Sequence, residues 1–329
     1  MKKLILFAHL SLFILTVNTQ QTDFPKLTGP YLGQRPPGLT PEIFAPGIVS
    51  SGSHDLNITI SPDLSEIYFT RSGPDWFSAI LVSKNSQHGW SKAEPLKFPG
   101  SMQSHYPFIT PDGKTMYFNA PGTEGSEEAK VWTATYDKGE FGDWKMLEAA
   151  VNAGGQAMFP SVSASGTLCF SSIRQDGQGG FDLYKSMRTA EGYGKPENLG
   201  PEINSAAHEF HAYIALDESY IIFDSQRPGG FGRNDLYISY RDLQGGWTKA
   251  LNMGPTINTE SGEQRPYVSP DREYLFFCSD RPNPQVAINE KPLTYDEFEK
   301  RINGPGNGFQ DIYWVSAKII EELRPKELK

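Results

Sequence analysis

The chain has 329 residues, of which 38% are hydrophobic and 12% aromatic, with 32 glycines and 25 prolines. This composition is too aromatic for a disordered chain, and the glycines and prolines indicate a fold with many turns. The net charge of −9, without a run of lysines or arginines, argues against nucleic acid or an anionic membrane as partner.

The first twenty residues have the pattern of an export signal. Lys2 and Lys3 precede a mostly apolar run from Leu4 to Val17, and polar residues follow. The run is short for a membrane span, and no other segment approaches the required length. We therefore expect residues 1–20 to be a signal peptide, the mature protein to be periplasmic or secreted, and no membrane span to remain after signal removal.

Five later segments repeat one pattern of strand, turn and strand. They are "NITISPDLSEIYFTR", "YPFITPDGKTMYFNA", "FPSVSASGTLCFSS", "HAYIALDESYIIFDS" and "RPYVSPDREYLFFCS". Their turns, marked at Pro62, Pro111, Ala164, Leu216 and Pro270, lie 49, 53, 52 and 54 residues apart. Two further strand-like elements recur downstream, as in "NDLYISY" and "GWTKALNM". Four short strands in a repeat of about 50 residues are typical of a β-propeller blade.

The repeats predict an all-β fold, a five-bladed β-propeller. Six blades are the alternative if residues 22–50 build more than one strand. The fifth repeat stops after its third strand, so we expect a strand from residues 41–50 to complete that blade and close the ring. The predicted organisation is an extension over 21–40 and a single propeller domain over 41–329. An insertion over 282–310 is expected above the top face, as a lid or specificity loop whose short helix begins at a Thr294–Glu297 capping box.

Several of these motifs resemble the TolB-type, WD-like propeller repeat of bacterial envelope proteins. They are "TPDGKTMYF" (110–118), "SQRPGGFGRNDLY" (225–237) and "SPDREYLFFCSDRP" (269–282). The third repeat departs from the pattern, because "SASGT" replaces the Pro-Asp turn. The resemblance implies a propeller fold. It says very little about function, because propellers serve many functions.

Residues that recur once per blade are best interpreted as structural. One aspartate in each of four turns is expected to accept hydrogen bonds from its own backbone: Asp63, Asp112, Asp217 and Asp271. Tryptophans of the fourth strands are expected to pack within blades: Trp90, Trp144 and Trp247. The two cysteines, Cys169 and Cys278, lie in apolar strands, where a free buried thiol is the commoner state.

The entries into the first strands should meet at the mouth of the central channel, on the face that we call the top. The candidate site residues there are His54, Asp55, Asn57, His105, Tyr106, His208, Glu209, His211, Glu263 and Arg265. The "HEFH" stretch is not a helical zinc motif, because His208 and His211 should point to opposite sides of a strand, whereas Glu209 and His211 should share one. We expect no cofactor and no tightly bound metal.

The second strands end near arginines on the same top face. These are Arg71, Arg174, Arg227 and Arg281. Their recurrence favours a structural role in bonding turn carbonyls. The functional alternative is a basic funnel that binds carboxylate or sulfate groups of a substrate.

Three functions are compatible with these candidate residues. The first is elimination from an acidic, uronate-type oligosaccharide by a lyase or dehydratase, in which Arg265 neutralises the carboxylate, His211 or His105 takes a proton and Tyr106 gives one. The second is a glycoside hydrolase that uses Asp55, Glu209 and Glu263, as in propeller furanosidases. The third is a non-catalytic, TolB-like module that binds proteins or glycans. The expected partners are accordingly an acidic oligosaccharide or envelope proteins, and a monomer is expected.

Overall fold

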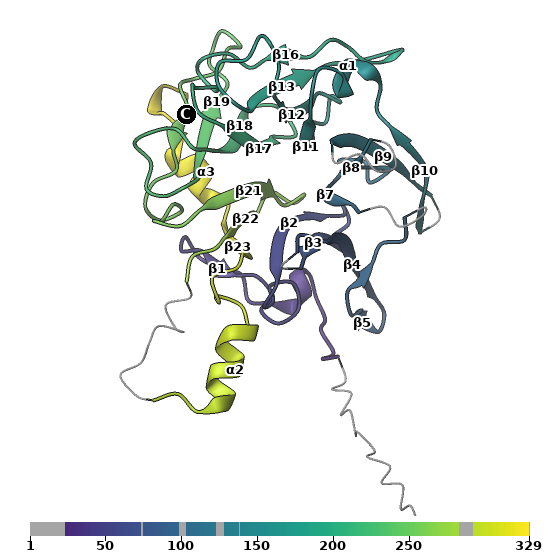
Figure 1. Cartoon of the computed structure of the whole chain (residues 1–329), viewed down its shortest axis with the longest axis vertical. Coiled ribbons are helices and arrows are strands. Elements are labelled where there is room, and N and C mark those ends of the chain that lie inside the picture. The colour runs from purple at the N-terminus through teal and green to yellow at the C-terminus, as the bar shows by residue number, and fades with distance from the viewer. Residues whose placement is uncertain are drawn as a thin grey trace, which may run out of the picture.

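The chain folds into a ring of five antiparallel sheets around a central axis, as the repeats predict (Figure 1). The computed structural model describes residues 24–73, 75–98, 103–122, 128–137, 139–282 and 292–328. The predicted export signal over 1–20 lies outside the described residues. A five-bladed propeller is therefore confirmed, and residues 24–50 add only one short strand to it.

Each blade is a meander whose first strand lines the channel. Blade 1 comprises β2 (His54–Ile60), β3 (Glu66–Ser72), β4 (Ser78–Ser86), β5 (Gly89–Trp90) and β6 (Glu94–Pro95). Blade 2 comprises β7 (His105–Ile109), β8 (Thr115–Pro121), β9 (Ala129–Asp137) and β10 (Glu140–Met146). Blade 3 comprises β11 (Ala157–Val162), β12 (Leu168–Ser172), β13 (Asp182–Ser186) and β16 (Glu197–Asn198), with the hairpin β14 (Arg188–Thr189) and β15 (Gly192–Tyr193). Blade 4 comprises β17 (Glu209–Ile214), β18 (Tyr220–Ser225), β19 (Asp235–Tyr240) and β20 (Leu251–Asn252).

Blade 5 combines both ends of the ring. Its strands are β21 (Glu263–Val268), β22 (Tyr274–Ser279), β23 (Asp311–Ser316) and the N-terminal β1 (Glu42–Ile43). β1 pairs antiparallel with β23, with Glu42 opposite Trp314 and Ile43 opposite Tyr313. The closing strand expected within residues 41–50 is thus present, and it covers the edge that β23 would otherwise expose.

The helices lie outside the sheets. Those of the described residues are η1 (Tyr31–Gly33), α1 (Ala149–Asn152), α2 (Tyr295–Asn303), α3 (Lys318–Leu323) and η3 (Lys326–Leu328). No helix of the described residues is long and apolar enough to cross a membrane. Around η1, the N-terminal segment bridges two blades, because Leu27 accepts a hydrogen bond from the backbone of Trp90 while the Tyr31 ring packs on Tyr274 and Trp314.

The part of the insertion that the structure describes, residues 292–310, contains the predicted short helix α2. α2 begins at Thr294 with the predicted capping box, in which Thr294 and Glu297 bond each other's backbone. However, α2 lies outside the circle of blades in Figure 1, and none of its residues is buried. The segment that follows α2 is held beside blade 1, because Asn307 donates a hydrogen bond of 3.2 Å to the carbonyl of Gly52.

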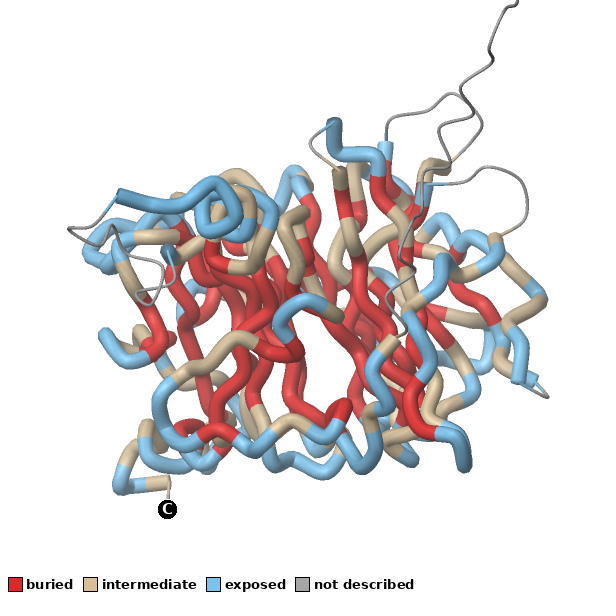
Figure 2. The backbone as a smooth tube through the Cα atoms, turned by 90° about the horizontal axis from the view of Figure 1, so that it is seen from below, coloured by how far each residue is buried: buried red, intermediate tan, exposed pale blue. Residues whose placement is uncertain are grey.

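Most of the core lies between neighbouring blades, and the exposed residues gather in the connections at the two faces (Figure 2). One phenylalanine of every second strand is at most 1% exposed: Phe69, Phe118, Phe170, Phe223 and Phe277. The tryptophans of the outer strands pack as expected: Trp90 is buried, Trp144 packs on Phe118, and Arg241 covers Trp247. Both cysteines are buried free thiols.

The aspartates of the turns have the predicted structural role. Asp63 accepts from the hydroxyl of Ser61 and the N–H of Ser65, and Asp112, Asp217 and Asp271 likewise accept from the N–H two residues later in their own blades. In blade 3, where the aspartate is missing, Glu218 of the next blade accepts from the hydroxyls of Ser163 and Ser165. The departure in the third repeat is therefore compensated by a carboxylate from its neighbour.

Candidate active site at the channel mouth

A β-bulge interrupts every innermost strand at the same position. The pairing register shifts between Asp55 and Ile58 in blade 1 and at the matching place in the other four blades. Three residues of the bulges, Tyr106, Phe159 and Arg265, have φ between 56° and 59°. Positive φ is uncommon for large side chains, and bulges often redirect side chains toward active sites.

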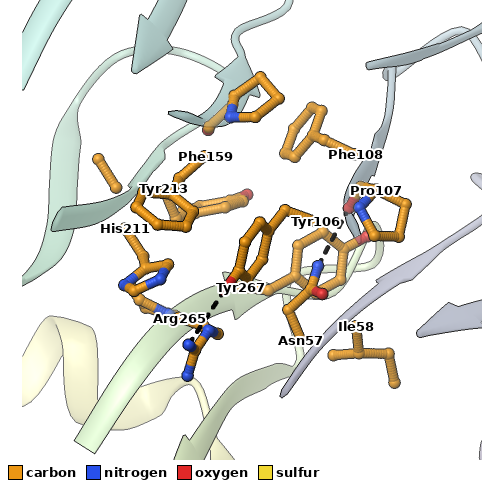
Figure 3. Close-up of a pocket in the computed structure, with 14 residues that line it drawn as sticks. Asn57, Ile58, Tyr106, Pro107, Phe108, Phe159, His211, Tyr213, Arg265 and Tyr267 are labelled. Atoms are coloured by element: carbon orange, nitrogen blue, oxygen red, sulfur yellow. Dashed lines mark hydrogen bonds between the residues drawn. The ribbon is translucent and has the colours of Figure 1, made fainter. Parts of the chain in front are cut away.

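The bulges point one residue of each blade into a common pocket. The five residues are Asn57, Tyr106, Phe159, His211 and Arg265, and they line the upper part of the channel (Figure 3). The free space among them is about 40 Å³. That volume accommodates a group such as a carboxylate but not a sugar ring, so a larger ligand would lie mostly above the pocket.

An aromatic layer closes the pocket from below. Phe108, Tyr213 and Tyr267 line both this pocket and a second one at the opposite end of the channel. The Tyr267 hydroxyl reaches across to blade 1, where it accepts from the N–H of Ile60 at 3.0 Å. A ligand would therefore enter from the top face.

His211 is held by a buried carboxylate. Its Nδ1 lies 2.7 Å from Oδ1 of Asp224, which is fully buried and also accepts from the side-chain amide of Asn234. Because an ionised carboxylate can only accept, Nδ1 carries the hydrogen and Nε2 presents a lone pair. Nε2 has no hydrogen-bond partner among the described residues. Burial, with a further contribution from Arg265, lowers the pKa of His211 to about 4 against the opposing effect of Asp224.

Arg265 is a buried cation beside this histidine. It is 9% exposed, and within the described part of the chain no ion pair joins it to a carboxylate. Its guanidinium donates instead to the hydroxyl of Tyr106 at 3.2 Å and to the sulfur of Cys278 at 3.0 Å. A buried guanidinium without an anionic partner favours an anionic ligand. The Tyr106 hydroxyl accepts from Arg265, which leaves its own hydrogen available for a ligand.

The three acids expected for hydrolysis are not placed for catalysis. Asp55, Glu209 and Glu263 are fully buried, and none lines the pocket. Each accepts from the backbone and hydroxyl of the residue four positions earlier, as Glu209 does from Ser205. Each also pairs with the arginine at the end of the second strand. The bulge breaks the two-residue alternation, so Glu209 does not share the direction of His211, contrary to the sequence expectation.

The four recurrent arginines are structural and do not form a basic funnel. Arg71, Arg174, Arg227 and Arg281 each donate to a backbone carbonyl more than twenty residues earlier: Val49, Val151, Ile203 and Ile257. Each guanidinium also lies over the buried phenylalanine of its own second strand. These contacts hold the four side chains against their own blades, although the Nε of Arg174 has no hydrogen-bond partner among the described residues. The interpretation as substrate-binding residues is therefore not supported.

The other three candidate histidines, His54, His105 and His208, do not line the pocket. His105 packs edge-on against Tyr106, and burial together with Arg265 lowers its pKa to about 4. His54 lies between the rings of Trp76 and Phe309, and His208 stacks on Phe210. His208 and His211 thus have separate environments. No group of three or more potential metal ligands occurs among the described residues.

Sequence reasoning missed Asp224. The residues equivalent to Asp224 in two other blades, Thr70 and Asn119, accept the backbone N–H of the bulge residue in the next blade. Asp224 faces the corresponding N–H of Arg265 at 3.4 Å and binds His211 as well. Asp224 is the one aspartate among these equivalent positions of the second strands, a signal that an alignment of the five repeats could have revealed.

Comparison with known proteins agrees with the fold. No family model matches the chain, and no curated protein matches it. Among solved structures, a thermostable family-43 glycoside hydrolase is 14% identical, with a TM-score of 0.51 over 81% of this chain and 89% of that one. TolB from Acinetobacter baumannii is 14% identical (TM-score 0.48; 80% of this chain, 57% of that one), and an α-L-arabinofuranosidase from Lactobacillus brevis is 16% identical (TM-score 0.48; 81% and 91%). At these identities, what is similar is the propeller fold.

Proposed function

We propose that the protein binds a carboxylate group of an acidic oligosaccharide at the channel mouth and catalyses its cleavage by elimination. The observation that carries the proposal is the buried Arg265, which lacks a carboxylate partner in the described chain, beside a His211 whose Nε2 lone pair is free. A uronate supplies what both groups lack, an anion for Arg265 and a weakly acidic C–H next to it for His211. Export to the periplasm or medium, predicted from residues 1–20, would bring the protein to such polymers.

The reaction follows from the three side chains. Arg265 neutralises the carboxylate and thereby acidifies the hydrogen on the adjacent carbon. His211 Nε2 takes this proton, and the electron pair of the C–H bond forms a carbon–carbon double bond. The bond from the next carbon to the glycosidic oxygen breaks, and this oxygen takes the proton of the Tyr106 hydroxyl. Solvent then returns a proton to Tyr106 and removes one from His211.

The supporting residue is Asp224. Its carboxylate fixes the tautomer in which Nε2 is the base and stabilises the imidazolium that forms during proton transfer. We assign Asp224 a positioning role, because it contacts His211 and not the pocket.

The test is an assay of the purified protein with uronate oligosaccharides, following the ultraviolet absorbance of the new conjugated double bond. His211→Asn and Tyr106→Phe should each lower kcat by about 100- to 10,000-fold with smaller effects on KM. Arg265→Gln should raise KM and also lower kcat, because Arg265 both binds the carboxylate and acidifies the adjacent hydrogen. His88→Asn, which changes an exposed histidine that does not line the pocket, should have no effect. Binding without any new double bond would overturn the elimination step, and absence of binding would overturn the carboxylate site.

A further inference from the structure

We propose that two aromatic platforms beside the pocket bind the neighbouring sugar rings, so that the protein takes an extended acidic chain across its top face. Platform A consists of His54, Trp76 and Phe309, and platform B of Phe181, His208 and Phe210. This inference rests on the proposed function and names its substrate class, an oligomer of several residues with a carboxylate at the mouth.

Platform A joins the top of blade 1 to the end of the insertion. The ring of His54 lies 4.7 Å from that of Trp76 at 19° and 4.4 Å from that of Phe309. Trp76 is nevertheless 57% exposed and Phe309 39% exposed. Large aromatic side chains grouped at a surface indicate a binding site more often than isolated ones do. The Nδ1 of His54 is buried without a partner, which adds a polar atom in need of a ligand.

Platform A lies close to the pocket. His54 begins β2, three residues before the pocket residue Asn57. The positive charge of Arg265 also acts on His54, whose pKa is lowered first by burial and second by Arg265. A ligand with its carboxylate on Arg265 would therefore have its next residue within reach of Trp76.

Platform B continues from the pocket toward blades 3 and 4. The rings of His208 and Phe210 stack at 5.2 Å and 10°, and Phe181 lies 5.3 Å from Phe210. His208 is held in this position because its Nδ1 accepts from the N–H of Phe181 at 3.0 Å. Phe210 in turn lies 6.0 Å from the His211 ring, so the platform is continuous with the pocket.

The chemistry of the surface favours a polysaccharide over other long ligands. The apolar C–H faces of pyranose rings pack well on flat aromatic side chains. The pocket itself offers one guanidinium without an anionic partner, which is enough to bind one carboxylate. Nucleic acid would need many more cations, and the chain carries a net charge of −9. Since the pocket of about 40 Å³ admits only the carboxylate, the rings themselves must lie on the surface around it.

The experiment compares ligands of increasing length. Binding of galacturonate monomer, trimer and pentamer is measured by calorimetry with the full chain after signal removal, in the His211→Asn variant so that the oligomers are not cleaved. A neutral β-1,4-glucan pentamer serves as a second ligand. We expect the pentamer to bind about 10- to 100-fold more tightly than the monomer. Trp76→Ala should weaken pentamer binding by about tenfold and leave the affinity for the monomer unchanged. Phe298→Ala, which alters an exposed aromatic on α2 outside the ring, is the matched control.

Each outcome separates the two proposals. If the monomer binds but the pentamer binds no more tightly, both platforms are wrong and the carboxylate site stands. If the pentamer binds more tightly but Trp76→Ala leaves its affinity intact, platform A is wrong. If the neutral pentamer binds as tightly as the acidic one, with the same dependence on Trp76, the platforms stand and the carboxylate site falls. If no saccharide binds, both fall, and a protein segment becomes the occupant to test.

Discussion

At the scale of single residues, the site is defined by groups that the fold leaves incompletely satisfied. His211 has one nitrogen bound to Asp224 and one free, and Arg265 has neutral partners only. The fully buried Asp55, in contrast, is paired with Arg71. Because a buried polar group without a partner destabilises the folded state, such groups are most readily explained by a ligand.

The buried histidines make stability depend on pH. The pKa of both His105 and His211 is lowered to about 4, mainly by burial, from the ordinary value of 6.5. Below pH 6.5 the unfolded chain takes up protons that the folded chain does not accept until about pH 4, so stability falls as pH decreases through this window. Burial acts in the opposite sense on two carboxyls, since it raises the pKa of Asp55 to about 6 and of Asp311 to about 7.

The variant His211→Asn separates the contribution of His211 to the pH dependence of stability from that of the carboxyls. His211→Asn keeps a donor for Asp224 but cannot titrate. Between pH 7 and pH 4.5 the wild type should lose stability relative to this variant by roughly 1–3 kcal/mol, because His211 titrates only in the wild type whereas His105 titrates in both. Urea unfolding of both proteins at the two pH values measures the difference, in which the carboxyl contributions cancel. Parallel pH dependences of wild type and variant would contradict the assignment of a buried neutral imidazole.

At the scale of elements, the turn and the bulge of each inner strand have different roles. The turn on the lower face is a repeated structural unit organised by an aspartate, such as Asp112 with Thr110 and Lys114. The bulge near the upper end presents a different residue in each blade. Repetition therefore marks the parts that hold the blade, and variation marks the parts that face the ligand.

The turn aspartates should contribute measurably to stability and nothing to binding. Asp112→Ala removes the acceptor for the Lys114 N–H and the Thr110 hydroxyl and should cost about 1 kcal/mol, whereas Asp112→Asn retains a carbonyl acceptor and should cost less. The free energy of unfolding in urea gives both values, with the exposed Glu140→Ala as control. An unchanged free energy of unfolding in Asp112→Ala would show that the turn is set by its backbone alone.

At the scale of the whole molecule, the ring is closed by interactions between its two ends. Beside the β1–β23 pairing, Ser50 exchanges hydrogen bonds with the backbone of Ile312, and Phe44 packs between Phe276 and Trp314. Arg71 of blade 1 bonds the carbonyls of Ile48 and Val49. Residues 44–50 thus connect blade 5 to blade 1, so closure involves far more than two strand residues.

Removing residues 41–50 should destabilise every blade. The deletion exposes the edge of β23 and removes the fully buried Phe44 and Val49, so we expect a loss of several kcal/mol and a markedly lower melting temperature. If the deleted chain does not fold at all, Phe44→Ala gives a milder test, with an expected cost of roughly 3–5 kcal/mol. Calorimetric melting checks both, and a truncated protein that melts like the full-length one would show that closure contributes little.

The sequence by itself determined the architecture, because repeated local signals suffice for it: strand alternation, Asp-containing turns and a spacing near 50 residues require no knowledge of distant contacts. It also identified the ring of residues that includes Tyr106, His211 and Arg265, since equivalent positions in a propeller converge at the axis. Only the tertiary structure decided which of the candidates are free to act. The bulge reverses the alternation between Glu209 and His211, an effect that local pattern does not reveal. Pairing across strands then satisfies Glu209 with Arg227 and fixes His211 on Asp224, and such partners depend on register and burial, which are properties of the folded chain.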